Sequence, residues 1–181
     1  MNRDLLNKNE SKSNLIHLNE NYKNGYTALH DAANRADKDL LNLALEIGMD
    51  INSKTNFGYT PLHYSVNNGS LEITELLIQN GADIHSKSNF NYTPLHYAAN
   101  SGKLQVTKFL LESGANPNAV NSFGYTPLHS AVQNNKFEIV EVLLNSGANP
   151  YLETNEGYSA FDLAKKNNSF QVEEVLNSIF R

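Results

Sequence analysis

The chain repeats itself every 33 residues, and this period constrains its fold more than any other feature. Related six-residue motifs start at Gly25, Gly58, Asn91, Gly124 and Gly157, and they read GYTALH, GYTPLH, NYTPLH, GYTPLH and GYSAFD. A second motif (GMD, GAD, GAN, GAN) keeps the same period. A fixed period of this length is the sequence signature of a repeat protein, so we expect similar units stacked side by side rather than one central core.

One unit, residues 58–90, predicts two short helices and a long loop. Thr60 is a good N-cap, and Pro61 suits the first helical position. Apolar residues then recur at helical spacing until Gly69, which suits a left-handed C-terminal residue. A second helix is predicted from about Leu71 to Gln79, followed by an extended, mostly polar loop over residues 82–92. The unit is therefore helix, tight turn, helix, loop.

Neither predicted helix is long enough to be stable in isolation, because each has about three turns or fewer. Stacking of neighbouring units would bury their apolar faces continuously. Small residues recur in the first helices, where they would allow close helix approach: Ala32, Ala33, Ala98, Ala99 and Ala131.

Together, the period, the Gly-x-Thr-Pro-Leu-His motif, the small residues after it and the Gly-Ala-Asp motif resemble the ankyrin repeat. The resemblance covers the chain from Gly25 to its end. It implies an all-α repeat solenoid of five stacked helix-turn-helix units with projecting β-hairpin loops, or fingers. It further implies an L-shaped stack whose concave face is built from the fingers and the first helices.

On this basis we expect residues 1–24 to be an N-terminal cap or a partly disordered lead, and residues 25–181 to be the repeat domain. Its repeats would begin at residues 25, 58, 91, 124 and 157, and the last would be a C-terminal cap, with Asp162 in place of the histidine. Asn91, Asn135 and Asn168 stand where other repeats carry glycine, and asparagine tolerates the positive φ that glycine supplies.

Composition restricts the possible functions. The chain has 14 basic and 19 acidic residues and a formal net charge of −5, which disfavours nucleic-acid binding. It has no cysteine, which excludes disulfides and thiolate chemistry. Neither a signal-peptide h-region nor a membrane-spanning apolar run is visible, so we predict a cytoplasmic protein that does not bind membranes. A host cell is the alternative location, if another kind of signal delivers the chain there.

No catalytic, cofactor-binding or metal-binding constellation is predicted, so we do not expect an enzyme. His30, His63, His96 and His129 recur every 33 residues, but helices packed about 8–10 Å apart cannot bring such a ladder onto one metal ion. Each histidine is the third residue of a predicted helix. We therefore expect its ring to hydrogen-bond the N-cap threonine or nearby loop backbone.

Aromatic residues recur at equivalent positions of successive repeats, and this column of aromatic positions is the most unusual feature of the sequence. By the resemblance, they lie at finger tips and on the concave side, where exposed rings are expected to anchor a partner. Packing between neighbouring fingers, or recent duplication, is the alternative explanation. The predicted aromatic binding residues are Phe57, Tyr59, Tyr64, Phe90, Tyr92, Tyr97, Phe123 and Tyr125.

Amide residues at the ends of the first helices form a second column, in which Asn67, Asn100 and Gln133 are the candidate binding residues. They could hydrogen-bond a partner, or they could serve capping and turn chemistry alone.

The predicted function is a non-catalytic scaffold that binds another protein through the concave face and finger loops, with no cofactor. We expect a monomer in isolation, with a self-associating module or homodimer as one alternative. The other alternative is a host-directed effector or regulatory subunit that acts on a partner enzyme. The fold does not choose among these, because fold and function are only loosely linked.

Overall fold

A computed structural model describes residues 22–178, and within this range the chain divides into two compact units that meet between Asp83 and Ile84. The first unit contains α2 (Ala28–Arg35), α3 (Lys38–Glu46), α4 (Pro61–Asn68) and α5 (Leu71–Gln79). The second unit contains α6 (Pro94–Ser101), α7 (Leu104–Glu112), α8 (Pro127–Gln133), α9 (Phe137–Asn145), α10 (Ala160–Lys166) and α11 (Phe170–Ser178). No helix in this part of the chain has the length and apolar character needed to cross a membrane.

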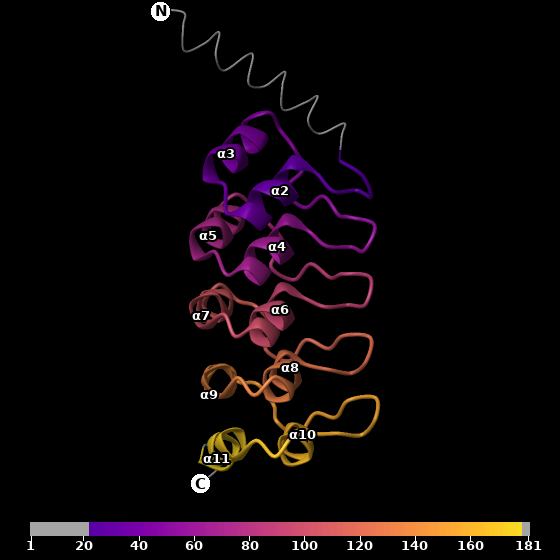
Figure 1. Ribbon diagram of the computed structural model, residues 1–181, viewed down its shortest axis with the longest axis vertical. Helices are drawn as coiled ribbons and strands as arrows, with labels where there is room; N and C mark the ends of the chain where they lie inside the picture. The colour runs from indigo at the N-terminus through magenta and orange to yellow at the C-terminus, as the bar shows by residue number, and fades with distance from the viewer. Residues whose placement is uncertain (1–21, 179–181) are drawn as a thin grey trace, which may run out of the picture. The chain divides into compact units, whose positions relative to one another are not determined.

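Each unit is built from two layers of helices. In the second unit, α6, α8 and α10 lie in one layer and α7, α9 and α11 in the other, and the finger loops extend from the side of the first layer (Figure 1). In the first unit, α2 packs against both α3 and α4, and α4 packs against α5. The helix–turn–helix units predicted from the period are therefore present in both parts.

The helix boundaries follow from local sequence. Helix α4 begins at Pro61 after the N-cap Thr60. It ends at Asn68 and is followed by the C-cap Gly69, whose φ of 91° lies in the left-handed region. Helix α5 spans Leu71–Gln79, as predicted. Asn91, Asn135 and Asn168 have φ values of 60°, 53° and 52°, which confirms that asparagine takes over a conformation suited to glycine.

Within each unit, the core lies between the two helix layers and between neighbouring repeats. One leucine per first helix is almost completely buried in the first four repeats, and the second helices add further apolar residues. The largest buried side chains include Leu29, Leu41, Leu62, Leu77, Leu95, Leu110, Leu128 and Leu143. In α4 and α6, the side chains that remain partly or fully exposed include a tyrosine and an asparagine each.

The fingers are closed loops without β-strands in residues 22–178, so the predicted β-hairpins are not formed as regular ladders. Four of the fingers are closed at the base by a backbone hydrogen bond such as Thr55 N to Tyr59 O at 2.9 Å, and the Thr55 carbonyl accepts from Gly58 N within the turn. The Tyr59 N–H, which a hairpin would use for the second bond, instead donates to the Thr55 hydroxyl at 3.2 Å. This side-chain competition explains why the ladder does not extend.

Asparagine side chains join neighbouring finger bases within each unit. Asn118 Nδ2 donates to Gly147 O at 2.9 Å, and Asn118 Oδ1 accepts from Asn149 N at 2.7 Å. Asn52 makes the equivalent pair of bonds with Gly81 and Asp83. One amide thus satisfies a carbonyl and an N–H of the next repeat.

Replacing Asn118 with alanine is expected to destabilise the chain by about 1–2 kcal/mol, because it removes both bonds and leaves two backbone groups without their partner. Denaturant unfolding monitored by circular dichroism measures this loss. Asn145→Ala is the matched control, since this exposed amide on α9 has no such inter-repeat role. Equal stability of the two variants would contradict the role given to Asn118.

The predicted N-terminal cap or lead over residues 1–24 lies almost entirely outside the described residues, and it stays a prediction.

Candidate partner-binding site

The predicted binding residues lie on the fingers and first helices of both units. The first unit carries Phe57, Tyr59, Tyr64 and Asn67, and the second carries Phe90, Tyr92, Tyr97, Asn100, Phe123, Tyr125 and Gln133. They differ in exposure: Phe57, Phe90 and Phe123 are 64%, 56% and 50% exposed. The tyrosines are partly buried, and the three amides are exposed. Within each unit, exposed phenylalanines therefore lie beside partly buried tyrosines, as Phe57 does beside Tyr59 and Phe123 beside Tyr92.

In the first unit the rings form one continuous cluster. Tyr64 lies edge-on to Tyr26 and to Tyr59, with ring centroids 5.3 and 6.1 Å apart. Phe57 approaches Tyr59 at 6.4 Å, and Tyr22 approaches Tyr26 at 5.5 Å. Edge-to-face contacts at these separations are favourable because the positive ring edge meets the negative ring face. The sequence reasoning did not include Tyr22 and Tyr26 among the binding residues, although Tyr26 belongs to the tyrosine column.

This cluster lines a hollow of about 430 Å³. Its lining comprises Tyr22, Lys23, Asn24, Tyr26, Thr55, Phe57 and Tyr64. Burial, together with the negative charge of Asp31, raises the pKa of Tyr26 to about 12. The Tyr22 hydroxyl donates to Asp31 at 3.0 Å, and burial, followed by this bond, raises its pKa as well. Both phenols therefore stay neutral donors at physiological pH.

In the second unit the predicted residues surround a groove of about 250 Å³. Five of them line it with one serine: Tyr92, Asn100, Phe123, Tyr125, Gln133 and Ser130. We call this set the aromatic groove. The Phe123 ring stacks on Phe90 at 5.9 Å and lies 6.5 Å from Tyr92, which in turn lies 5.6 Å from Tyr97. Neighbouring fingers pack, as the alternative explanation held, and the phenylalanine rings still remain at least half exposed.

Tyr125 is held from both sides of its backbone. Its N–H donates to Asn121 Oδ1 at 3.0 Å, and its carbonyl lies 3.0 Å from His96 Nε2 in the preceding repeat. Its ring packs against His129 with centroids 5.8 Å apart. These contacts fix one wall of the aromatic groove before any partner arrives.

A column of buried polar residues positions four of the fingers, and it was not predicted from the sequence. Each member accepts a hydrogen bond from the N–H of the tyrosine four residues later, at 3.0–3.2 Å. The members are Thr55, Ser88, Asn121 and Thr154. All four obey the 33-residue period and carry a short side chain with an oxygen acceptor. That periodic signal could have identified the column.

Asn121 offers a direct test of this positioning, because its Oδ1 accepts from both Phe123 N, at 2.9 Å, and Tyr125 N, at 3.0 Å. We expect Asn121→Ala to destabilise the chain by about 1–2 kcal/mol by leaving these donors without an acceptor. Asn121→Ser restores the residue type that Ser88 supplies in the preceding finger, so it should cost clearly less. Thermal and denaturant unfolding of both variants gives the comparison, and an alanine variant as stable as the serine one would refute the role.

The amide column has a structural role that involves the next residue along the chain. Asn134 Nδ2 donates to Asn100 Oδ1 at 2.8 Å and to Ser130 O at 2.9 Å. Asn68 likewise donates to Asn34 O, and Asn167 donates to Gln133 O at 3.4 Å. The bonds from Asn134 to Asn100, from Asn68 to Asn34 and from Asn167 to Gln133 each join residues 34 positions apart in neighbouring repeats. Capping and turn chemistry within one repeat did not predict these bonds. The side chains of Asn100 and Gln133 still line the aromatic groove.

The histidines cap the first helices, as predicted. Nδ1 accepts from the threonine backbone N–H at 3.1–3.2 Å in Thr27–His30, Thr60–His63, Thr93–His96 and Thr126–His129. In His30 and His96, Nε2 lies 3.0 Å from a carbonyl oxygen, which can only accept. The neutral tautomer with hydrogen on Nε2 satisfies both bonds.

Burial lowers the pKa of the His96 ring to about 4, and it also lowers the pKa values of His30 and His129.

Within residues 22–178, no group of three or more His, Asp or Glu side chains lies in a position to hold a metal ion.

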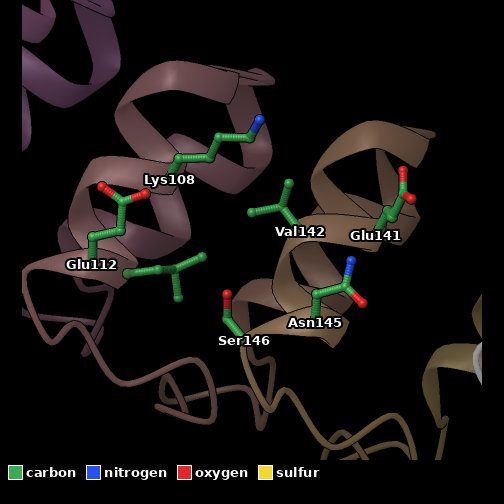
Figure 2. A pocket seen from close by; sticks show the side chains of 7 residues that line it. Lys108, Glu112, Glu141, Val142, Asn145 and Ser146 are labelled. Atoms are coloured by element: carbon green, nitrogen blue, oxygen red, sulfur yellow. The ribbon is translucent and has the colours of Figure 1, made fainter.

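A larger hollow of about 560 Å³ lies on the other helix layer, between α7 and α9. Figure 2 shows Lys108 and Glu112 on one helix and Glu141 and Asn145 on the other, with Val142 pointing into the space between them. Its charged side chains are of mixed sign, and no aromatic ring lines it. It lacks the exposed anchors that distinguish the aromatic groove.

Comparison with known proteins gives the same fold as the geometry. The sequence model described as "Ankyrin repeats (3 copies)" matches residues 3–88 and 85–154, which is most of the chain. No curated protein matches the sequence. The matched repeats and the paired helices agree in giving the fold class of an all-α repeat solenoid. The chain is therefore a member of the ankyrin repeat family.

Proposed function

We propose that the chain is a non-catalytic scaffold that binds another protein through its finger tips and first helices. Ankyrin repeats generally mediate protein–protein interaction, and the family is typically non-catalytic. The observation that carries the proposal is the exposure of Phe57, Phe90 and Phe123 beside partly buried tyrosines. Exposed aromatic rings grouped in this way are typical of interaction sites, because their burial supplies much of the binding energy.

The mechanism is recognition by a preformed surface. The tyrosine rings are held by ring contacts and by main-chain hydrogen bonds, as Tyr125 illustrates. A partner that covers the phenylalanine rings would therefore pay little for ordering the site. In the second unit, the amides of Asn100 and Gln133 would add polar contacts that fix its orientation, and Asn67 would do the same in the first unit.

Quantitative affinity capture from the native cell lysate, and from a host lysate where a host exists, tests this proposal. The baits are the wild type, a Phe57→Ser/Phe90→Ser/Phe123→Ser variant, and Phe170→Ser as matched control. Phe170 is 81% exposed but belongs to α11, outside the fingers. We expect one prey to be enriched on wild type and on the control but lost from the triple variant, with all three baits showing the same circular dichroism spectrum. Retention of the prey by the folded triple variant would overturn the assignment.

Two alternative functions have their own readouts. A self-associating module would use the same phenylalanines to form a homodimer, and light scattering would then give twice the 20.2 kDa chain mass. A host-directed effector or regulatory subunit would capture an enzyme and change its activity. An aromatic-dependent prey together with a concentration-independent monomer mass supports the scaffold.

A further inference from the structure

The lining of the aromatic groove carries no charge. Its side chains are three aromatic rings, two amides and one hydroxyl. The helices that supply the amides and the serine, α6 (PLHYAANS) and α8 (PLHSAVQ), contain no Asp, Glu, Lys or Arg, and the three aromatic rings come from the finger loops. The chain as a whole carries a formal charge of −5, so this neutrality is a local property. A groove of this kind complements an uncharged ligand, because a buried unpaired charge on the ligand would be costly.

The groove exposes more polar than apolar surface, and its apolar side chains are aromatic. The aliphatic residues of α6 and α8 are buried, with Leu95 at 1% exposure and Leu128 and Val132 at 0%. An amphipathic partner helix requires a broad hydrophobic groove for its anchors, and α6 and α8 offer none. Addition of a partner strand requires a sheet edge, and residues 22–178 contain no strand. Two of the common modes of peptide recognition are thus disfavoured.

We propose that the aromatic groove binds an uncharged, proline-rich segment in the polyproline II conformation; this inference rests on the proposed function and names its partner chemistry. Aromatic-lined grooves dock such segments because a preformed polyproline II helix loses little entropy on binding. Proline rings pack against the rings of Tyr92, Phe123 and Tyr125. The segment makes no internal backbone hydrogen bonds, so its carbonyl oxygens are available to donors on the groove wall.

The groove supplies those donors. Asn134 engages the Asn100 side-chain oxygen at 2.8 Å, which leaves the Asn100 NH₂ group as the donor end of that amide. Gln133 is exposed at the end of α8 and contributes a second NH₂ group. The phenol of Tyr125 adds a hydroxyl beside them. The aromatic rings of the groove would thus contact proline rings, and its NH₂ and OH donors would bind the backbone carbonyl oxygens of the segment.

Titration of the full chain with synthetic peptides, followed by isothermal calorimetry, tests the inference. The probe is a short acetylated and amidated peptide rich in Pro-Pro-x triplets with no charged residue. One comparison peptide has alanine for every proline, and another has lysine at the spacer positions. We expect the proline peptide to bind about tenfold or more tightly than the alanine peptide. Its affinity should change less than about twofold between about 50 and 500 mM salt, because no charge is involved.

Variants locate the binding. Phe123→Ser and Gln133→Ala should each weaken the proline peptide by about tenfold, whereas Phe170→Ser should leave its affinity unchanged. Gln133 is exposed, so its variant keeps the test valid even if Phe123→Ser perturbs the finger. Equal binding of the proline and alanine peptides overturns the inference. So does stronger, salt-dependent binding of the lysine peptide, or equal affinity of the groove and control variants.

Failure of this inference is distinguishable from failure of the proposed function. If the proline peptide does not bind but a cellular prey still depends on the finger phenylalanines, the scaffold function stands and the polyproline specificity falls. If the peptide binds equally to all variants, the groove is not its site.

Discussion

Acidification from pH 7 to pH 4 is expected to lower the free energy of unfolding by about 3 kcal/mol. The pKa of His96 falls from 6.5 to about 4 on folding because the ring is buried. Between pH 6.5 and pH 4 this histidine is therefore protonated in the unfolded chain but stays neutral in the folded chain. This stability is fully present above pH 6.5 and is lost as the pH falls towards 4. A difference of this size corresponds to ~3 kcal/mol for His96 alone, and burial of His30 and His129 acts in the same direction.

Denaturant unfolding at intervals between pH 7 and pH 4 measures this loss, and His96→Gln isolates its source. Glutamine at the third helical position can still form a capping box with Thr93, but it cannot take up a proton in this range. We expect the glutamine variant to lose less stability than the wild type between pH 7 and pH 4. An unchanged pH dependence in His96→Gln would rule out the histidine as the cause.

Asp162 replaces the histidine in the last repeat. Hydrogen bonds from Ser159 lower the pKa of this carboxyl, so its contribution to stability is lost only below about pH 3.8.

Gly124→Ala is expected to destabilise the chain by about 2–5 kcal/mol and to weaken partner binding. Gly124 has a φ of 77°, and a Cβ there would lie 2.5 Å from the backbone nitrogen of Asn155 in the next finger. The left-handed conformation costs an alanine about 1–2 kcal/mol, and relief of the clash requires a shift of backbone. The residue lies between Phe123 and Tyr125, so this shift displaces two rings of the aromatic groove.

Gly147→Ala is the matched control for this prediction. Gly147 has a φ of 87°, but nothing lies within 4 Å of the position that a Cβ would occupy. It should therefore lose only the ~1–2 kcal/mol of conformational strain and keep its partner. Unfolding free energies and capture assays on both variants provide the comparison. If the two alanines cost the same, close contact between the fingers is not the reason for glycine at position 124.

Much of the fold could be predicted from local sequence. The start of α4 at Pro61 and the span of α5 follow from capping residues and helical periodicity within one repeat. The capping role of His96 could be predicted for the same reason, since Thr93 and His96 are only three residues apart. Features that involve contacts within a single repeat were therefore accessible without a structure.

Features that depend on how neighbouring repeats are offset could not be predicted. The hydrogen bond from Asn134 to Asn100 joins residues that are 34 positions apart, one more than the period, and nothing in the sequence gives that offset. Contacts between neighbouring fingers, such as the stacking of Phe90 on Phe123 with ring centroids 5.9 Å apart, depend on the same offset.

Photocrosslinking at Phe123 tests the binding face most directly. A photoreactive benzoylphenylalanine at this position retains an aromatic ring, so the finger need not lose its packing, and the same substitution at Phe170 serves as the control. We predict that illumination in the native cell, or in the host cell, joins position 123 to one partner protein and leaves position 170 without that partner. Crosslinks to the same protein from position 170 but not from position 123 would contradict the account, because the partner would then contact α11 rather than the fingers.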